Sequence, residues 1–277
     1  MNRLSIRRGA LALAAAAALA AIVAPQAGAK QLACGATITK DTKLTRDLVD
    51  CPGVGIRIGA DDVALDLNGH TVAAAAKRNP KAHGILNKGH DGVTIEGGTV
   101  KGFGAYGVRL ADAKRNVVRD MHMIGNFTGI GLVESSSNLV THSDMSGSRF
   151  VGVNLTGGAH NRVIANAITA SVGLGVLVQT SVNDPGSDNR ILDNVIEGNG
   201  IQVNPGQASA QIAGNTIRHA RFAGIAAFEP STIIERNTSS DNRGLGILAP
   251  NGAVDRGGNG ATGNGQEPQC VGVACAG

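Results

Sequence analysis

An internal repeat of about 23 residues constrains this chain more than any other feature. A glycine followed by isoleucine or valine recurs at Gly55, Gly84, Gly107, Gly129, Gly152, Gly175, Gly200, Gly224 and Gly246. A second file of branched aliphatic residues follows at Leu67, Ile95, Val118, Val140, Val163, Ile191, Ile212 and Ile234. A third file lies five residues further on, at Val72, Val100, Met123, Met145, Ile168, Ile196 and Ile217. Three short apolar segments therefore recur in each repeat.

These segments alternate with polar residues, which is typical of half-buried strands. A unit of three such strands cannot bury its own apolar side, so it must stack on copies of itself. Leucine-rich repeats are the competing solenoid, but the chain lacks their leucine-dense consensus and any helical stretch. A β-sandwich would not keep Ile or Val at one phase of nine consecutive units. We therefore predict an all-β solenoid of about nine coils.

Asparagines recur at one bend of the later repeats. They lie three residues after the second file and two before the third, at Asn166, Asn194, Asn215 and Asn237. Amides stacked on successive coils can bond one another and satisfy backbone groups that a turn leaves unpaired. We interpret them as a structural ladder. The equivalent positions of earlier repeats hold His70, Gly98, Met121 and Ser143.

The repeats resemble a known family. The segments 65–72 (LDLNGHTV), 84–87 (GILN) and 189–196 (NRILDNVI) are similar to repeats of right-handed parallel β-helix proteins, the pectin-lyase-like superfamily. The resemblance covers about residues 33–260 and implies a right-handed parallel β-helix. Members include pectate and alginate lyases, polygalacturonases, mannuronan epimerases, phage tailspikes and a periplasmic copper-processing family. Because one scaffold hosts many activities, the activity must be argued from the site.

The chain divides into four predicted parts. Residues 1–29 have a basic start, an apolar run and a small-residue site ending at Ala29, which predicts a signal peptide cleaved there. Residues 30–54 alternate like strands without the repeat spacing, so we expect an N-terminal cap. Residues 55–260 form the β-helix, and residues 261–277 a Gly-rich tail. The product is expected to be secreted or periplasmic, with no membrane segment in the mature form.

Four cysteines lie near the two ends of the mature chain, at Cys34, Cys51, Cys270 and Cys275. In an oxidising compartment disulfides are expected, and four cysteines allow three connectivities. The local pairing, Cys34 with Cys51 and Cys270 with Cys275, needs the least long-range closure. It would close the cap and a small loop in the tail. The alternative, a zinc site, is disfavoured because neither pair has knuckle spacing or a neighbouring histidine.

Charge and aromatic content exclude some partners. Lys and Arg number 25 against 21 Asp and Glu, and three of the arginines lie in the predicted signal peptide, leaving 22 against 21. This nearly neutral balance gives no electrostatic reason to expect nucleic-acid binding. There is no Trp and one Tyr. Phe127, Phe150 and Phe222 each lie two residues before a repeat glycine, which predicts a stacked column inside the helix. We therefore expect no exposed ring platform for neutral sugars.

The resemblance implies a substrate groove along the outer face of the strand that begins at each Gly-Ile/Val pair. The outward row would be Arg57, Leu86, Arg109, Gly131, Asn154, Leu177, Gln202, Ala226 and Leu248. We expect substrate contacts from this row and from the inserted stretch 73–82, at Arg57, Asn154, Gln202, Lys77 and Arg78. The aspartates that polygalacturonases need are missing from the row. The epimerase Asp-Pro-His motif is also missing, because residues 184–186 are Asp-Pro-Gly.

Two carboxylates share a phase on adjacent coils. Asp112 and Glu134 each lie five residues after a repeat glycine, so their carboxylates would be ~5 Å apart. Such a pair would share a proton or hold calcium. The alternative is two solvated loop carboxylates that pair with nearby basic residues. By resemblance to the lyases of this fold, Arg109 would be the base, with Asp112 and Glu134 binding charge or calcium. Calcium is thus expected only for a lyase, and no other cofactor is expected.

Our function hypothesis is contact with an extracellular, acidic polysaccharide, with β-elimination or epimerisation of a uronate if the protein is an enzyme. The alternative is a non-catalytic structural or adhesin-like surface solenoid. A second alternative is periplasmic metal handling, although the seven histidines fall at different phases and predict no metal site. The sequence specifies no oligomeric state.

Overall fold

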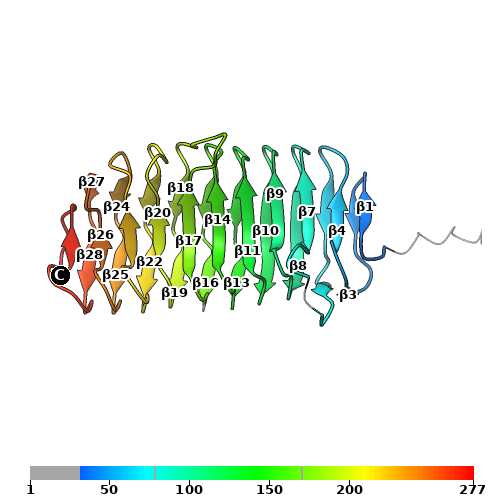
Figure 1. Cartoon of the computed structure of the whole chain (residues 1–277), viewed down its shortest axis with the longest axis horizontal. Helices are drawn as coiled ribbons and strands as arrows, with labels where there is room; N and C mark the ends of the chain where they lie inside the picture. Colours follow the sequence, from blue (N-terminus) through cyan, green and yellow to red (C-terminus); the bar gives the residue numbers. More distant parts are fainter. Residues whose placement is uncertain (1–31, 78, 170) are drawn as a thin grey trace, which may run out of the picture. The chain divides into compact units, whose positions relative to one another are not determined.

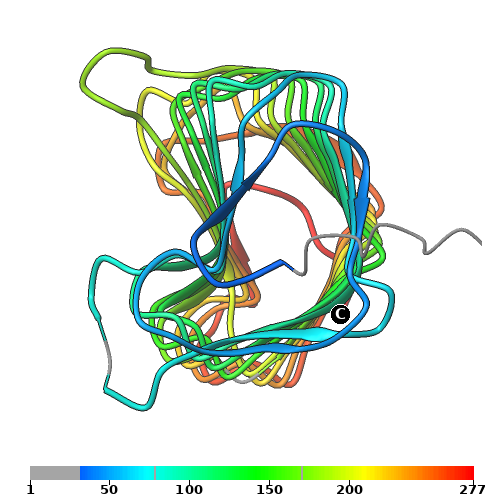
Figure 2. The same cartoon turned by 90° about the vertical axis from the view of Figure 1, so that its right-hand side faces the viewer.

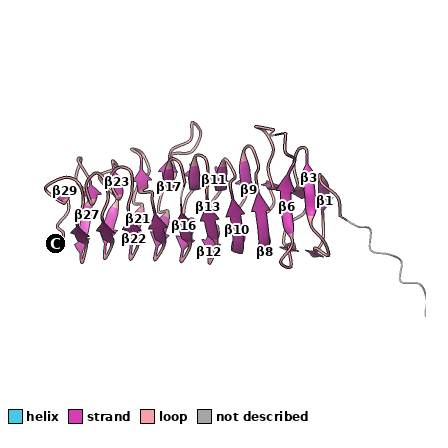
Figure 3. Ribbon diagram, turned by 90° about the horizontal axis from the view of Figure 1, so that it is seen from below, coloured by secondary structure: helices cyan, strands magenta, loops and turns pink. Residues whose placement is uncertain are grey.

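Each sequence repeat forms one coil of a parallel β-solenoid in the computed structural model, which describes residues 32–77, 79–169 and 171–277. The predicted signal peptide and the predicted substrate contact Arg78 lie outside the described residues. Strands joined by turns and loops make up the fold, and the described residues contain no helix (Figure 3). The predicted right-handed parallel β-helix is confirmed.

The first strand of every coil joins one eleven-stranded parallel sheet, here called sheet A (Figure 1). Its strands, in spatial order, are β1 (Ala36–Ile38), β4 (Ile56–Ile58), β7 (Ile85–Lys88), β9 (Tyr106–Ala111), β11 (Thr128–Val133), β14 (Val151–Thr156), β17 (Leu174–Gln179), β20 (Ile201–Val203), β23 (Ile225–Ala227), β26 (Ile247–Leu248) and β29 (Cys270–Val271). The nine predicted repeats supply β4 to β26, and β1 and β29 extend the sheet at its two ends.

The second and third strands of the coils form two further parallel ladders. One contains β2 (Thr42–Lys43), β5 (Ala64–Asp66), β12 (Leu139–Thr141), β15 (Arg162–Ile164), β18 (Arg190–Leu192), β21 (Gln211–Ala213), β24 (Ile233–Glu235) and β27 (Val254–Gly257). The other contains β3 (Leu48–Cys51), β6 (Thr71–Ala74), β13 (Asp144–Ser146), β16 (Ala167–Thr169), β19 (Val195–Glu197), β22 (Thr216–Arg218), β25 (Thr238–Ser240) and β28 (Gly260–Thr262). The two ladders merge at β8 (Thr94–Lys101) and β10 (Val117–Ile124), which run straight through the bend and pair with both.

The strand register places side chains of the same type on top of one another in successive coils. Val118 pairs with Val140 and Val140 with Val163, and all three side chains are fully buried. One predicted file member is wrong: Leu65, not Leu67, pairs with Ile95. Two extra residues, Asn68 and Gly69, both with positive φ, lengthen the turn after β5 and displace the sequence spacing there. Leu67 is nevertheless buried.

Disulfides join local cysteines at both ends of the solenoid. Cys34 bonds Cys51 and Cys270 bonds Cys275, which confirms the local connectivity. Strands β1, β2 and β3 pair with β4, β5 and β6, so the segment predicted as a cap is built as a coil. At the other end, β28 and β29 continue the pairing past residue 260.

Buried asparagines line two bends. At one, the side-chain amide nitrogens of Asn166, Asn194 and Asn215 each donate to the Oδ1 of the next asparagine at 3.0 Å, and Asn237 donates to Asn259 at 3.2 Å. The second bend carries a ladder that the sequence analysis missed, which runs through Asn87, Asn116, Asn138, Asn161 and Asn189. For all of these except Asn87, its signal was a recurrent Asn two residues before the second aliphatic file.

Two excursions depart from the regular coil. Residues 75–84 join β6 to β7, and residues 180–189 join β17 to β18. Seen along the stack, the two loops project on the same side, one from each edge of sheet A (Figure 2). The outward face of sheet A therefore lies between these two excursions.

Candidate functional site

The predicted outward row exists as one file across sheet A. Arg57 pairs with Leu86, Leu86 with Arg109, Arg109 with Gly131 and Gly131 with Asn154. Leu177, Gln202, Ala226 and Leu248 continue it. On β4, the neighbours Ile56 and Ile58 are buried while Arg57 is exposed, as alternation requires. The row thus places Arg57 and Arg109 two coils apart, ~9.6 Å at the usual strand spacing.

Tyr106 lies at the centre of this part of the face. The Arg109 guanidinium carbon lies 5.5 Å from the centre of its ring, and the His83 ring centre lies 5.6 Å from it. The Tyr106 ring crosses the next coil at Gly131, where an added Cβ would lie 2.3 Å from Cε1. Gly131 is therefore required for the ring to lie flat on the sheet. The sequence analysis missed Tyr106 because it fell outside the outward row.

His83 packs beneath this cluster. Burial, and then the positive charges of Arg109 and Arg57, lower the pKa of His83 to about 4. The Nδ1 atom of His83 is buried and has no hydrogen-bond partner. The Nε atom of Arg109 is likewise buried without a partner. A neutral imidazole adds no third positive charge between the two arginines. The cluster therefore combines two guanidiniums and an aromatic ring with a buried, uncharged histidine.

The surrounding surface lacks carboxylates over long stretches of sequence. Residues 67–90, 97–111, 121–133 and 145–183 contain no Asp or Glu. They include sheet A strands β7, β9, β11, β14 and β17 and the turns that lead into them. Lys77, Lys81, Arg109 and Arg149 all belong to these stretches. This half of the face is therefore positively charged, although residues 30–277 as a whole hold 22 Lys and Arg against 21 Asp and Glu.

The predicted internal phenylalanine column is wrong. Phe127 and Phe150 are each 41% exposed and Phe222 is 75% exposed. The rings of Phe127 and Phe150 stack outside the helix, with centres 5.4 Å apart and planes 14° from parallel. At this bend the period-two alternation of a strand does not apply. The position of a phenylalanine within the repeat therefore does not predict whether its side chain points inward or outward. Only Phe103, one coil earlier, points inward.

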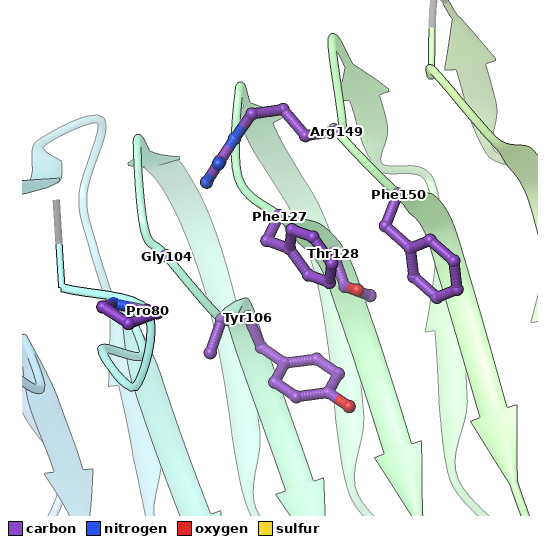
Figure 4. A pocket seen from close by; sticks show the side chains of 8 residues that line it. Pro80, Gly104, Tyr106, Phe127, Thr128, Arg149 and Phe150 are labelled. Atoms are coloured by element: carbon purple, nitrogen blue, oxygen red, sulfur yellow. The ribbon is translucent and has the colours of Figure 1, made fainter.

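These rings line a surface pocket of about 400 Å³ (Figure 4). Its lining residues are Pro80, Gly104, Ala105, Tyr106, Phe127, Thr128, Arg149 and Phe150. The Arg149 guanidinium carbon lies 5.8 Å from the centre of the Phe127 ring, and its Nη2 donates to the Phe103 carbonyl at 3.1 Å. The exposed aromatic surface that the sequence analysis did not expect is thus present, next to basic residues.

The predicted catalytic carboxylates lie at the opposite edge of sheet A. Asp112 and Glu134 follow β9 and β11 directly, both with left-handed φ, and Asp112 N donates to Val133 O at 3.0 Å. Ser181 Oγ and Asn183 Nδ2 donate to Glu134 Oε1 at 2.9 and 3.2 Å. The 180–189 loop thereby folds back onto Glu134. Within the described residues, no ion pair joins Arg109 to either carboxylate.

The predicted substrate contacts differ in accessibility. Arg57 and Lys77 are exposed, and Gln202 is half-buried and donates to Asn204 Oδ1 at 2.7 Å. Asn154 is buried at 4% exposure. The side chains of Thr156 and Gln179 lie 3.4 and 3.5 Å from its Oδ1. Arg57 is therefore accessible to solvent. Asn154 belongs to the outward row, but neighbouring side chains cover it.

Comparison with protein families adds an independent observation. The model described as "Right handed beta helix region" matches residues 83–232, which is more than half of the chain. The chain belongs to this right-handed β-helix family. No curated protein sequence matches the chain significantly.

Solved structures similar to this β-helix share its fold at low sequence identity. A mutant of the periplasmic alginate epimerase AlgG aligns with a TM-score of 0.62 and 15% identity, covering 75% of this chain and 55% of the epimerase chain. The Dettilon tailspike protein aligns with a TM-score of 0.54 and 16% identity, covering 87% and 60%. A double mutant of the epimerase gives 0.62 and 13%, covering 84% and 72%. The chain spans little more than half the length of the first two.

The described part of this β-helix holds no group of three or more His, Cys, Asp or Glu side chains that would bind a metal ion. Five histidines instead pair singly with carboxylates, such as His122 with Asp144 at 3.1 Å. Over the same residues, there is no helix of the length and hydropathy needed to cross a bilayer.

Proposed function

We propose that this β-helix binds an acidic polysaccharide along the outward face of sheet A, centred on Arg57, Tyr106 and Arg109. The observation that carries the proposal is the pair of guanidiniums two coils apart on a face whose strands and entering turns lack carboxylates. A polyanion gains from several such contacts at once, and because His83 is neutral it adds no further positive charge that would repel the two arginines in the unbound state.

The comparisons support a polysaccharide as the ligand class. An alginate epimerase and a phage tailspike protein share the fold. The two disulfides favour an oxidising compartment, where extracellular polysaccharides are found. Signal-peptide cleavage near Ala29 and a secreted or periplasmic location remain part of this proposal.

For a catalytic form of the function, Arg109 would act as the base in β-elimination or epimerisation of a uronate, and Asp112 and Glu134 would bind charge or calcium. Both carboxylates directly follow the ends of their sheet A strands, β9 and β11. Turnover is measured as absorbance at 235 nm for elimination and by NMR for epimerisation, with and without calcium. Loss of turnover in Arg109→Ala supports the assignment, and full turnover in that variant contradicts it.

Binding is tested by calorimetry with oligomers of alginate and polygalacturonate, with dextran as the neutral comparison. The double variant Arg57→Ala/Arg109→Ala is expected to weaken binding at least tenfold, since each charge-assisted contact contributes ~1.5–3 kcal/mol. The matched control is Arg162→Ala/Arg190→Ala, which removes the same charge from two paired, exposed arginines on another ladder. Equal loss in both variants would show non-specific attraction and contradict the site.

The second hypothesis, a non-catalytic surface solenoid, is favoured by one feature of the site. Glu134 is held by Ser181 and Asn183, and no ion pair joins it to Arg109 among the described residues. Binding of uronate oligomers without any turnover in wild-type protein would select this form of the function over the enzymatic one.

A further inference from the structure

The pocket beside Phe127 is a slot with two flat walls. The Phe150 ring lies nearly parallel to the Phe127 ring, with centres 5.4 Å apart, and both rings line the pocket, which extends from them toward the preceding coils. On that side the pocket is bounded by Pro80, which lies in the 75–84 excursion (Figure 4). Gly104 and Ala105, on the coil between them, form the floor.

The slot exists because the middle coil places only the small residues Gly104 and Ala105 between the two walls. Phe103, which precedes Gly104, is turned into the helix and fully buried. Gly104 packs directly under the excursion, and a Cβ there would lie 1.9 Å from the Asn79 carbonyl oxygen. Pro80 precedes β7 and Phe127 precedes β11, so the coils that carry the two walls are two coil spacings apart, or ~9.6 Å along the stack. A ring held between two flat groups needs about two van der Waals contacts, or ~7–8 Å.

The chemistry of the lining selects for a ring with an apolar face and a negative substituent. Phe127 and Pro80 offer apolar surfaces to the C–H face of a sugar. Arg149 holds its guanidinium near the Phe127 ring, and Tyr106 places the slot next to Arg109. The segments that contribute the lining contain no Asp or Glu. A neutral sugar would pack against Phe127 and Pro80 but would gain nothing from the positive charge of Arg149 and Arg109.

We propose that the slot is a subsite for one uronate ring of an acidic polysaccharide, with the C–H face of the sugar on Phe127 and its carboxylate beside Arg149. This inference rests on the proposed function and extends it, because it adds a stacking position at the edge of sheet A that the row of outward residues lacks. The polysaccharide would run from the slot past Tyr106 to Arg109 and Arg57.

The protein carries its own probe for this test. Tyr106 is the only Tyr and there is no Trp, so intrinsic emission excited near 280 nm comes from a residue that lines the slot. Titration with alginate and polygalacturonate tetramers is expected to change this emission, and Phe127→Ala is expected to raise Kd at least tenfold. The control, Phe222→Ala, removes a phenylalanine of the same repeat phase that lies outside the slot, and should leave Kd unchanged.

The outcomes separate the two proposals. If Arg57→Ala/Arg109→Ala abolishes binding while Phe127→Ala binds as wild type, the slot is wrong and the proposed function stands. If neither variant changes Kd, the proposed function fails as well. If neutral mannan oligomers bind as tightly as uronates and lose the same affinity in Phe127→Ala, the slot binds sugar but the assignment of its carboxylate partner is overturned. Folding of each variant is checked by its far-UV circular dichroism and unfolding midpoint.

Discussion

At the scale of single residues, His83 shows how burial changes the charge of a surface. An exposed histidine between two arginines would still be partly protonated near pH 6.5. Burial removes that charge, so no third positive charge lies near Arg57 and Arg109. Neither effect is visible in the repeat pattern, because His83 precedes the repeat glycine at a bend.

The pKa of His83 predicts a pH dependence of stability. Its pKa is about 4 in the folded state against 6.5 ordinarily, so between these values the unfolded state binds more protons. Stability should therefore fall as the pH is lowered from 6.5 to 4, by ~1–3 kcal/mol from this group. Urea unfolding of wild type and His83→Gln measures it, and the variant should show a flatter profile in that window.

His122→Gln is the control for this experiment, since His122 is 58% exposed and pairs with Asp144 on the surface. The lowered pKa values of Asp47, Asp61, Asp66 and Glu229 act in the same direction at lower pH, because their carboxylates are favoured in the folded state. These four carboxylates are present in both His83→Gln and His122→Gln, so they cause no difference between the two pH profiles. An unchanged profile in His83→Gln would contradict the buried, neutral state of the histidine.

At the scale of elements, the bends are held by side-chain amides and the strands by apolar files. Asn194 Oδ1 accepts from both the backbone N and the Nδ2 of Asn166, and its own Nδ2 donates to Val163 O and Asn215 Oδ1. One side chain therefore satisfies groups on both neighbouring coils. A break in the ladder leaves buried polar groups unpaired on each side.

Asn194→Ala is expected to lower the free energy of unfolding by ~2–4 kcal/mol, because it leaves several buried donors and acceptors without partners. Asn251→Ala is the comparison: Asn251 is exposed and donates one bond to Phe228 O, so its loss should cost about 0.5 kcal/mol. Urea denaturation followed by circular dichroism measures both. Similar losses would show that the ladder does not stabilise the coil stack beyond an ordinary surface hydrogen bond.

The elements also show what a repeat can predict. Nine strands of sheet A, their register and the outward row followed from phase alone, since stacked coils force equal phases into contact. Phase failed at bends. Leu67 lies at the start of a lengthened turn, and Phe127 and Phe103 leave similar bends in opposite directions. The candidate site was predicted in part, through Arg57 and Arg109, but Tyr106, His83 and the slot depend on side-chain packing that no periodicity encodes.

At the scale of the whole described unit, the disulfides act on chain segments of different length. Cys34–Cys51 closes 17 residues and Cys270–Cys275 closes 5. The loop-entropy model gives ~3 kcal/mol for the longer loop and ~2 kcal/mol for the shorter. Removing Cys34–Cys51 by double Ala substitution should therefore lower the urea midpoint more than removing Cys270–Cys275. The reverse order would show that the last coils depend on their disulfide more strongly than chain entropy predicts.

The 180–189 excursion leaves the coils on either side of it unchanged. Asn161 and Asn189 are 28 residues apart, whereas Asn138 and Asn161 are 23 apart, yet both pairs make the same amide contact and Val163 still pairs with Ile191. The extra residues are absorbed entirely at one corner. Val182 is fully exposed at this corner. Foreign peptides inserted there should therefore be displayed at one fixed position along the solenoid axis, without disturbing the pairing of the coils.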